Sequence, residues 1–369
     1  MTREYRAVIV GAGRKAGPID DERGPGDRAW LKPWGHASAY QAVPGCRVVA
    51  VADPLEDKLH RFCNRYDIPG RYTDYREMID REQPDLVSVT TWAGLHAEVT
   101  VFAAEHGARG IYVEKALCGS LAEADAMRAA CRQHGVAFNY GAGRRYRPGY
   151  GKMRDLGASG DLGEVRGVII NCGMGGLMHG QSHMVDTAMH LLGDPEPEFA
   201  QGYIHTETGP DGEHTDGYYD AAANRWCGQS VTGSDPRLAA AYIRFTDGTD
   251  ATIWANGERW YQFTLVGTTG LAQASDNNSS YEARRIAEAG IFRSEPLPFP
   301  AFEDESDTVV AIRELIAAIA ADTPEATSGN IERAHRGTEI LFALAQSHLE
   351  DGRRIGFPVE NRTMYIPSR

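Results

Sequence analysis

Two ionisable residues, Glu114 and Lys115, directly follow the apolar run at 110–113. Such a run is typical of a buried strand, in which successive side chains point to opposite faces. Ligands of a parallel sheet gather at the carboxyl ends of its strands, which is where Lys115 would lie. We therefore expect Lys115 to exchange a proton with a substrate and Glu114 to brace the adjacent loop or line the cofactor edge. The alternative is an ion pair at a solvated strand end.

Two histidines and an aspartate form the second candidate group. A helix beginning near Ser182 would place His183, Asp186 and His190 at positions i, i+3 and i+7, along one face. His179 lies four residues before His183, in the preceding loop. These side chains suit acid–base chemistry, a metal site or a hydrogen-bonded structural face. Because a metal needs three or four convergent ligands and this segment offers two histidines at that spacing, we predict no metal and a structural role for His190.

A glycine-rich turn follows the first apolar run. Gly11 and Gly13 stand where a dinucleotide site needs a tight turn and a backbone that a pyrophosphate can approach. The next glycine, Gly17, gives the spacing G-x-G-x-x-x-G, which is one residue too long. A Pro-rich insertion at about 14–34 then precludes a regular helix, so we expect the helix to begin near Gly35.

Asp53 supplies the second half of this signature. It ends the apolar run at 47–52, where an acidic residue accepts hydrogen bonds from an adenosine ribose. This favours NAD over NADP, because an aspartate would repel the 2′-phosphate. The alternative is that Asp53 caps the helix that follows, with Pro54 at the first helical position.

The composition limits the class of protein. The chain has 369 residues, which suggests two domains. A formal net charge of −13 argues against a nucleic-acid or anionic-membrane surface, and no run of about 18 apolar residues predicts a membrane helix. The N-terminus lacks a secretory pattern and the six cysteines form no C-x-x-C pair. We therefore expect a cytoplasmic enzyme with no nucleic-acid or membrane partner.

The order of the predicted elements indicates two architectures. Residues 1–143 alternate short β-branched runs with amphipathic stretches, which predicts an α/β Rossmann domain, a parallel doubly wound sheet with helices on both faces. In residues 144–369, strands follow one another with a hairpin centred on Asp247, and helices are predicted at 307–321 and 331–348. This second part is predicted to be an α+β domain with a large, mostly antiparallel open sheet.

Together these segments resemble the glucose–fructose oxidoreductase/inositol dehydrogenase/MocA (Gfo/Idh/MocA) family of NAD(P)-dependent oxidoreductases. The matching segments are "GHASAY", "VVAVADP", "TWAGLHAEV", "VEKALCGSLAEADAM" and "GQSHMVDTAMHLLGDP". They are spread from Val8 to about Pro195. The resemblance implies a Rossmann domain joined to an α+β domain whose open sheet often mediates oligomerisation, here as a homodimer or homotetramer.

The resemblance also implies roles for single residues. Lys115 matches the family's catalytic lysine, His183 its catalytic histidine and Asp186 the carboxylate that follows. With the residues argued above, the expected catalytic set is Lys115, His183 and His179. The expected cofactor contacts are Gly11, Gly13, Asp53, Thr91, Trp92, His96, Glu114, Lys115 and Arg144. The expected substrate contacts are Lys115, Arg145, His179, His183 and Asp186.

The chain departs from the family pattern at two positions in the matching segments. Ala116 stands where the usual Glu-Lys-Pro has proline, and His179 stands where many members carry an aspartate. An aspartate would hold substrate hydroxyls, whereas His179 can itself take a proton or donate to an anion.

Two reaction hypotheses use these residues. The first is NAD-dependent hydride transfer at a sugar, sugar derivative or polyol, with Lys115 and His183 in acid–base roles. The second is a redox-neutral NAD-dependent glycosidase or lyase, in which transient oxidation of a sugar carbon precedes elimination, water addition and re-reduction. Arg144, Arg145 and Arg147 could then serve an anionic glycoside.

Overall fold

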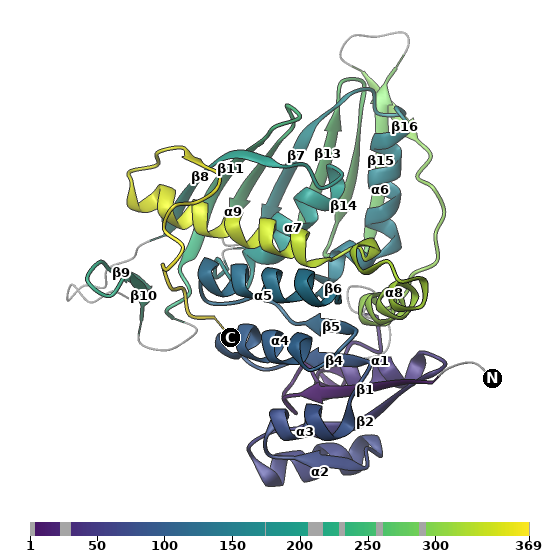
Figure 1. The fold of residues 1–369 in the computed structure, drawn as a ribbon. Coiled ribbons are helices and arrows are strands. Elements are labelled where there is room, and N and C mark those ends of the chain that lie inside the picture. The colour runs from purple at the N-terminus through teal and green to yellow at the C-terminus, as the bar shows by residue number, and fades with distance from the viewer. Residues whose placement is uncertain are drawn as a thin grey trace. The chain divides into compact units, whose positions relative to one another are not determined.

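The structure is a computed structural model that describes residues 4–22, 31–173, 175–205, 217–228, 233–255, 261–287 and 293–368. The chain forms two compact units, drawn in Figure 1. Unit 1 comprises Met1–Tyr146 and Glu305–His335, and unit 2 comprises Arg147–Asp304 and Arg336–Arg369. This division differs from the predicted single boundary after residue 143, because the segment from Glu305 packs with the first unit.

Unit 1 is built on a six-stranded sheet in the order β3-β2-β1-β4-β5-β6. Every pair of neighbouring strands in it is parallel, and β4, β5 and β6 are buried along their whole length. Burial on both faces explains their nearly continuous apolar sequences. The strands are β1 (Tyr5–Val10), β2 (Cys46–Ala52), β3 (Gly70–Tyr72), β4 (Leu86–Val89), β5 (Gly110–Val113) and β6 (Ala137–Tyr140).

Helices cover both faces of this sheet. One hydrophobic cluster joins the sheet to α1 (His36–Ala42), α2 (Glu56–Tyr66) and α8 (Asp307–Ala321). A second cluster joins it to three further helices and the first turn of α9; the three are α3 (Tyr75–Glu82), α4 (His96–Glu105) and α5 (Leu121–His134). Helix α8 packs against α1, β5 and β6, which is why this late segment belongs to unit 1. Four short 3-10 helices are described here: η1 (Pro18–Asp21), η2 (Ala93–Leu95), η3 (Gly143–Tyr146) and η4 (Pro324–Ala326).

Unit 2 contains a nine-stranded sheet in the order β16-β15-β14-β13-β7-β12-β11-β8-β17. Only the β7–β12 pair of this sheet is parallel, and the predicted hairpin is the β11–β12 pair. The predicted fold class is therefore confirmed. The strands are β7 (Val165–Cys172), β8 (Pro197–His205), β11 (Arg237–Phe245), β12 (Asp250–Ala255), β13 (Gln262–Gly267), β14 (Gly270–Ser275), β15 (Ser280–Ile286), β16 (Ser294–Leu297) and β17 (Ile355–Gly356), with β9 (Tyr218–Asp220) and β10 (Arg225–Cys227) as a separate pair.

One face of the large sheet is covered by helices and the other is open. Helices α6 (Pro148–Ala158) and α7 (Gln181–Leu191) contact strands β7, β13 and β14, and α9 (Ile331–Leu349) lies against β8 (Figure 1). On the opposite face Ile169, Tyr203 and Trp254 are about half exposed. In the parts of the chain described above, no helix has both the length and the apolar character required to cross a bilayer.

Candidate functional site

A pocket of about 600 Å³ lies at the carboxyl ends of β1, β2 and β4. Its volume is typical of sites for small molecules and cofactors. The N-terminal ends of α2 and α3 and the η2 turn before α4 also line it, so its helix ends suit an anionic ligand. Five predicted cofactor residues line the pocket, together with Lys58, which was not predicted: Gly11, Gly13, Asp53, Thr91 and Trp92.

The two glycines of the turn serve different purposes. Gly11 has φ of +96°, and a Cβ there would lie 3.1 Å from the backbone carbon and oxygen of Thr90. The Thr90 hydroxyl in turn donates to the Gly11 carbonyl at 2.7 Å, so the fold itself needs glycine at position 11. At Gly13 a Cβ would come no closer than 3.7 Å to Thr90. Close packing within the fold therefore does not require glycine at position 13, and the open space beside it is what a pyrophosphate-binding turn needs.

The third position of the turn is Ala16, and this corrects our interpretation of Gly17. Ala16 is fully buried in the cluster that contains Ile9, Ala37 and Tyr40. The turn therefore reads G-x-G-x-x-A, a spacing that a dinucleotide site allows because the third small residue is needed for close packing of helix on strand. Ala16 lies three residues after Gly13, and this spacing was the signal that sequence reasoning missed.

The insertion interrupts the first turn of α1. The amides of His36 and Ala37 donate to the carbonyls of Lys15 and Ala16 at 3.2 and 2.8 Å, so the first residues of the predicted insertion continue the helix that begins at His36, as predicted near Gly35. The chain then leaves and returns at one place: a Cβ on Gly35 would lie 2.6 Å from the Gly17 Cα. Part of the predicted insertion, residues 23–30, lies outside the described residues.

Asp53 is buried and accepts three hydrogen bonds. Its Oδ2 accepts from the Ala12 amide at 2.9 Å and from the Lys58 ammonium at 2.6 Å, and its Oδ1 accepts from the Leu55 amide at 3.1 Å. Leu55, not Asp53, is the N-cap of α2. Asp53 precedes the cap by two residues, and its hydrogen bond to the Leu55 amide holds the turn that leads into the helix. Asp53 thus holds the glycine turn and the start of α2 together at the pocket wall.

Glu114 braces the tip of β5 and is not among the pocket-lining residues. Its Oε1 accepts from His36 Nε2 at 3.1 Å and lies 3.6 Å from Lys15 Nζ, and its Oε2 accepts from the Lys115 amide at 3.3 Å. Burial alone would raise the pKa of this carboxyl, but the Lys15 ammonium and the hydrogen bond from His36 bring it to about 2. Burial lowers the pKa of His36, so Lys15 is the counter-charge of an ionised Glu114.

Ser88, His36 and Glu114 form a buried chain that resembles a hydrolytic triad. His36 Nδ1 lies 2.9 Å from Ser88 Oγ, which also lies 2.9 Å from the Tyr40 hydroxyl. Ser88 lies inside β4 with 0% exposure, so no substrate can reach its oxygen. The chain is therefore a satisfied core network and not a nucleophilic site.

His96 lies behind the pocket wall and joins the ends of two strands. Its Nδ1 lies 2.8 Å from the Ala116 carbonyl and its Nε2 lies 3.1 Å from the Thr91 carbonyl. Burial lowers the pKa of this imidazole. Because Thr91 follows β4 and Ala116 follows Lys115, His96 fixes the turn on which Lys115, which is partly buried, is presented.

The two predicted arginines are buried in unit 1. Arg144 and Arg145 lie in η3 and are 7% and 4% exposed. Arg145 Nη1 donates to the Ser328 carbonyl at 3.1 Å. This bond gives Arg145 a role in holding the segment after η4, alongside the predicted role towards a substrate.

The predicted histidines of unit 2 lie on α7 and the loop before it. His183 is partly buried and His179 is exposed, whereas Asp186 and His190 are buried. The helix begins at Gln181 with Gly180 as N-cap, one residue before the start predicted near Ser182. The Ser182 hydroxyl donates to the His179 carbonyl at 3.4 Å.

Asp235, which sequence reasoning did not identify, positions the loop before α7. Its carboxylate accepts from the Met178 and His179 amides at 2.9 and 2.8 Å, and it is 5% exposed. The separation of 56 positions between His179 and Asp235 explains why no local pattern reveals the contact. In the described ranges, no group of three or more His, Cys, Asp and Glu side chains is arranged to hold a metal ion.

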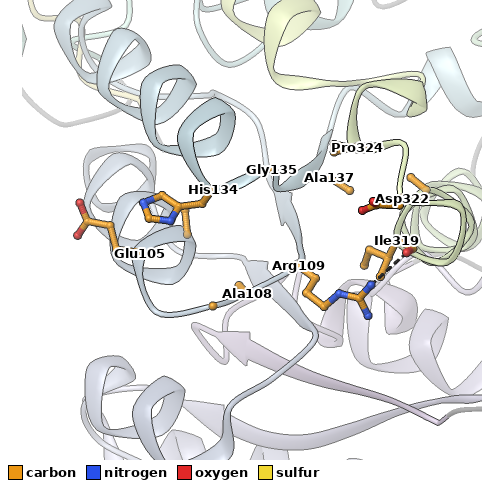
Figure 2. Close-up of a pocket in the computed structure, with 12 residues that line it drawn as sticks. Glu105, Ala108, Arg109, His134, Gly135, Ala137, Ile319, Asp322 and Pro324 are labelled. Carbon is orange, nitrogen blue, oxygen red and sulfur yellow. Dashed lines mark hydrogen bonds between the residues drawn. The ribbon is translucent and has the colours of Figure 1, made fainter.

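A second pocket, of about 290 Å³, lies at the amino ends of β5 and β6. Figure 2 shows the Arg109 guanidinium directed at the Ile319 carbonyl, with Nη2 at 3.1 Å. Arg109 Nη1 lies 3.8 Å from Asp85. The C-terminal ends of α4, α5 and α8 surround this pocket.

Comparison with known proteins identifies unit 1. Residues 28–142 match a family model described as "Oxidoreductase family, NAD-binding Rossmann fold" (GFO_IDH_MocA). These residues match the NAD-binding Rossmann domain of the Gfo/Idh/MocA family. The predicted cofactor, NAD, agrees with the family description, and the pocket with its turn of Gly11, Gly13 and Ala16 fits such a dinucleotide. The matched span begins inside the insertion and so leaves the turn itself out of the match.

Individual relatives of the Gfo/Idh/MocA domain support the same assignment. The scyllo-inositol 2-dehydrogenase (NAD(+)) of Bacillus subtilis (strain 168) is 30% identical over 164 residues, 44% of this chain and 43% of that protein. The match spans less than half the length of the first curated relatives. An aldose-aldose oxidoreductase of Caulobacter crescentus has a TM-score of 0.74 at 19% identity, over 96% of this chain and 100% of that one. A levoglucosan dehydrogenase in complex with NADH has a TM-score of 0.74 at 16% identity, over 97% and 100%. At these identities the two structures show the fold alone.

Proposed function

We propose that this protein is an NAD-dependent oxidoreductase that transfers a hydride between a sugar, sugar derivative or polyol and the nicotinamide. The observation that carries the proposal is the pocket at the carboxyl edge of the unit 1 sheet, with the glycine turn and Asp53 in its wall. Lys115 is the second residue after β5 at that edge. The substrate class is supported by the curated relative named as an inositol dehydrogenase.

The residues have separate roles in this proposal. Gly11, Gly13 and Asp53 would hold the dinucleotide, which when bound accepts or returns a hydride at its nicotinamide ring. Lys115 and His183 would exchange the proton of the substrate hydroxyl, an effect of about 10²–10⁴-fold in rate. His179 would orient the substrate or relay that proton. Arg145 and Asp186 remain proposed substrate contacts, and Arg144 a proposed cofactor contact.

The test is a panel of sugars, sugar acids and polyols, with NADH formation followed by absorbance. Lys115→Met should lower kcat by about 100-fold or more while the Kd for NADH changes less than about threefold. Arg109→Met is the matched control, because it removes a cation at the opposite end of the same strand. Turnover by Lys115→Met within about threefold of wild type would contradict the proposed role of Lys115.

The same experiment distinguishes the redox-neutral alternative. If the purified protein retains bound NAD through dialysis, forms no net NADH from any member of the panel and releases the leaving group from a glycoside, the reaction is a lyase or glycosidase reaction. That result would contradict net hydride transfer and favour the redox-neutral reaction, and NAD would remain the proposed cofactor.

The open face of the unit 2 sheet is proposed as the contact between copies of the chain. Tyr203, Ala240 and Trp254 stand opposite one another on neighbouring strands, and Tyr203 and Trp254 are 55% and 57% exposed. An apolar row of this kind is typical of an association surface. Light scattering should show a homodimer or homotetramer in the wild type and a smaller species for Trp254→Lys. A wild-type monomer would contradict this proposal. Cytoplasmic localisation stays a prediction.

A further inference from the structure

The cofactor pocket carries both acids and bases at its Asp53 end. Its wall contains Asp53, Lys58, Asp74 and Arg76. Lys58 Nζ lies 2.6 Å from Asp53 Oδ2, and Arg76 is paired with Glu98 and lies 3.9 Å from Asp74. Arg76 is thus shared between two carboxylates, whereas Lys58 is the cation directly beside Asp53. The simple argument that an aspartate repels a 2′-phosphate therefore does not describe this wall.

Lys58 is the one partner of Asp53 that can move. The other two hydrogen bonds to the carboxylate come from the backbone amides of Ala12 and Leu55, which the glycine turn and the start of α2 hold in place. The Lys58 side chain is 37% exposed and the Asp53 side chain only 5%. The ammonium, which has three donors, can therefore also contact a ligand at the pocket without disturbing the turn.

We propose that Lys58 is a specificity-determining residue of the cofactor site: it neutralises Asp53 and supplies the cation for a ribose 2′-phosphate, so that the pocket accepts NADP as well as NAD. The inference rests on the proposed function, because it requires a dinucleotide in this pocket. A ribose 2′-hydroxyl would donate to Asp53, whereas a 2′-phosphate would pair with the Lys58 ammonium by charge-assisted hydrogen bonds.

The two cofactors would respond differently to salt. An ion pair between Lys58 and a phosphate at a half-exposed site is screened by added salt, whereas a hydrogen bond from a neutral ribose hydroxyl is affected less. We therefore expect the Kd for NADPH to rise more steeply with sodium chloride than the Kd for NADH in the wild type. In Lys58→Met the two slopes should converge.

The test is fluorescence titration of the purified full chain with NADH and with NADPH, which needs no substrate. In the wild type the two Kd values should lie within about tenfold of each other, and Lys58→Met should raise the Kd for NADPH at least about tenfold while that for NADH changes less than about threefold. Lys58→Arg keeps the charge and should retain NADPH binding. Arg61→Met is the matched control, because Arg61 is an exposed cation on the same helix that does not line the pocket.

Two results would overturn the inference. One is a ratio of the two Kd values that is the same in Lys58→Met and the wild type within about twofold, and the other is an equal change in Arg61→Met. If neither NADH nor NADPH binds to the wild type, the proposed function fails. If NADH binds and Lys58→Met leaves the ratio unchanged, only the role of Lys58 fails. Circular dichroism of each variant separates loss of fold from loss of selectivity.

Discussion

Strand β5 has a charged residue at each end, and the two are held in different ways. Arg109 precedes the strand, its side chain is 39% exposed, and it donates to the Ile319 carbonyl (Figure 2). Glu114 follows the strand, is 5% exposed, and is held by Lys15 and His36. The buried end is the one that needs a counter-charge, because desolvation of an unpaired carboxylate is far more costly than that of a half-exposed guanidinium.

The helix ends around the two pockets explain this difference. At the amino edge the C-terminal ends of α4, α5 and α8 present carbonyl groups, which favour a cation, and the protein supplies its own in Arg109. At the carboxyl edge the N-terminal ends of α2 and α3 favour an anion, and the pocket is about twice as large. One edge therefore contains a cation supplied by the protein in a smaller pocket, and the other has the larger space for a ligand.

Removing the charge of Glu114, at the carboxyl end of β5, should have the largest effect on the free energy of unfolding. In the folded state the pKa of Glu114 is about 2, below the ordinary value of 4.5 for this side chain. A lowered folded pKa means that the ionised group stabilises the fold above pH 4.5, and that this stabilisation is lost as the pH falls towards about 2. Glu114→Gln should lower the free energy of unfolding by on the order of 3 kcal/mol above that window.

The measurement for Glu114→Gln is denaturant unfolding of both proteins at a series of pH values. The difference in free energy of unfolding between the wild type and the variant should shrink as the pH is lowered through the window from 4.5 to about 2. A difference that stays constant across this window would show that the Glu114 carboxyl titrates normally.

A methyl group at Gly13, in the glycine turn, should have the next largest effect. It should weaken binding of the cofactor and leave the stability of the fold unchanged. Gly13→Ala should raise the Kd for NADH by about ten- to hundredfold, equivalent to about 1.4–2.8 kcal/mol, because Cβ would occupy the space for the pyrophosphate. The melting temperature should not change, since Cβ lies 3.7 Å from Thr90. Gly11→Ala is the contrasting variant and should destabilise the fold by about 1–3 kcal/mol. Equal losses of stability in both variants would contradict the separate roles.

Removing the charge of Arg109, at the amino end of β5, should have the smallest effect. Arg109→Met removes the hydrogen bond to the Ile319 carbonyl and the contact with Asp85, and should lower the free energy of unfolding by about 1 kcal/mol because the side chain is partly solvated. The Kd for NADH should be unaffected. Titration and denaturant unfolding of the same preparation test both statements, and a changed Kd would show that the two edges are coupled.

Local periodicity predicted most of the elements. The first apolar run, before the glycine turn, is β1, and the helix predicted at 307–321 is α8 with the same bounds. These segments are strongly patterned over their whole length, so their own sequence decides their structure. Strand β3 was not predicted, because its three residues are too few to show a period. The pocket position followed from the rule that ligands bind at carboxyl edges.

What could not be predicted depends on residues far apart in the chain. Lys15 and Glu114 are separated by nearly a hundred residues, and so no sequence pattern could reveal that they are partners. The place of α8 in unit 1 depends on packing against α1, β5 and β6. In the sequence, nothing distinguishes Lys58 from other helix lysines, and its proposed role depends on its distance to Asp53. Such contacts are products of the tertiary structure alone.

The meeting of Gly17 and Gly35 makes the insertion separable from the helix that it interrupts. Since its two ends are already in contact and the helix is completed across them, a segment of another length could join the same two points, at a cost in loop-closure entropy that grows only slowly with length. The position is therefore a natural place for grafting a reporter peptide or an affinity sequence next to the nucleotide turn. Evolution could vary this stretch in the same way without redesigning the sheet beneath it.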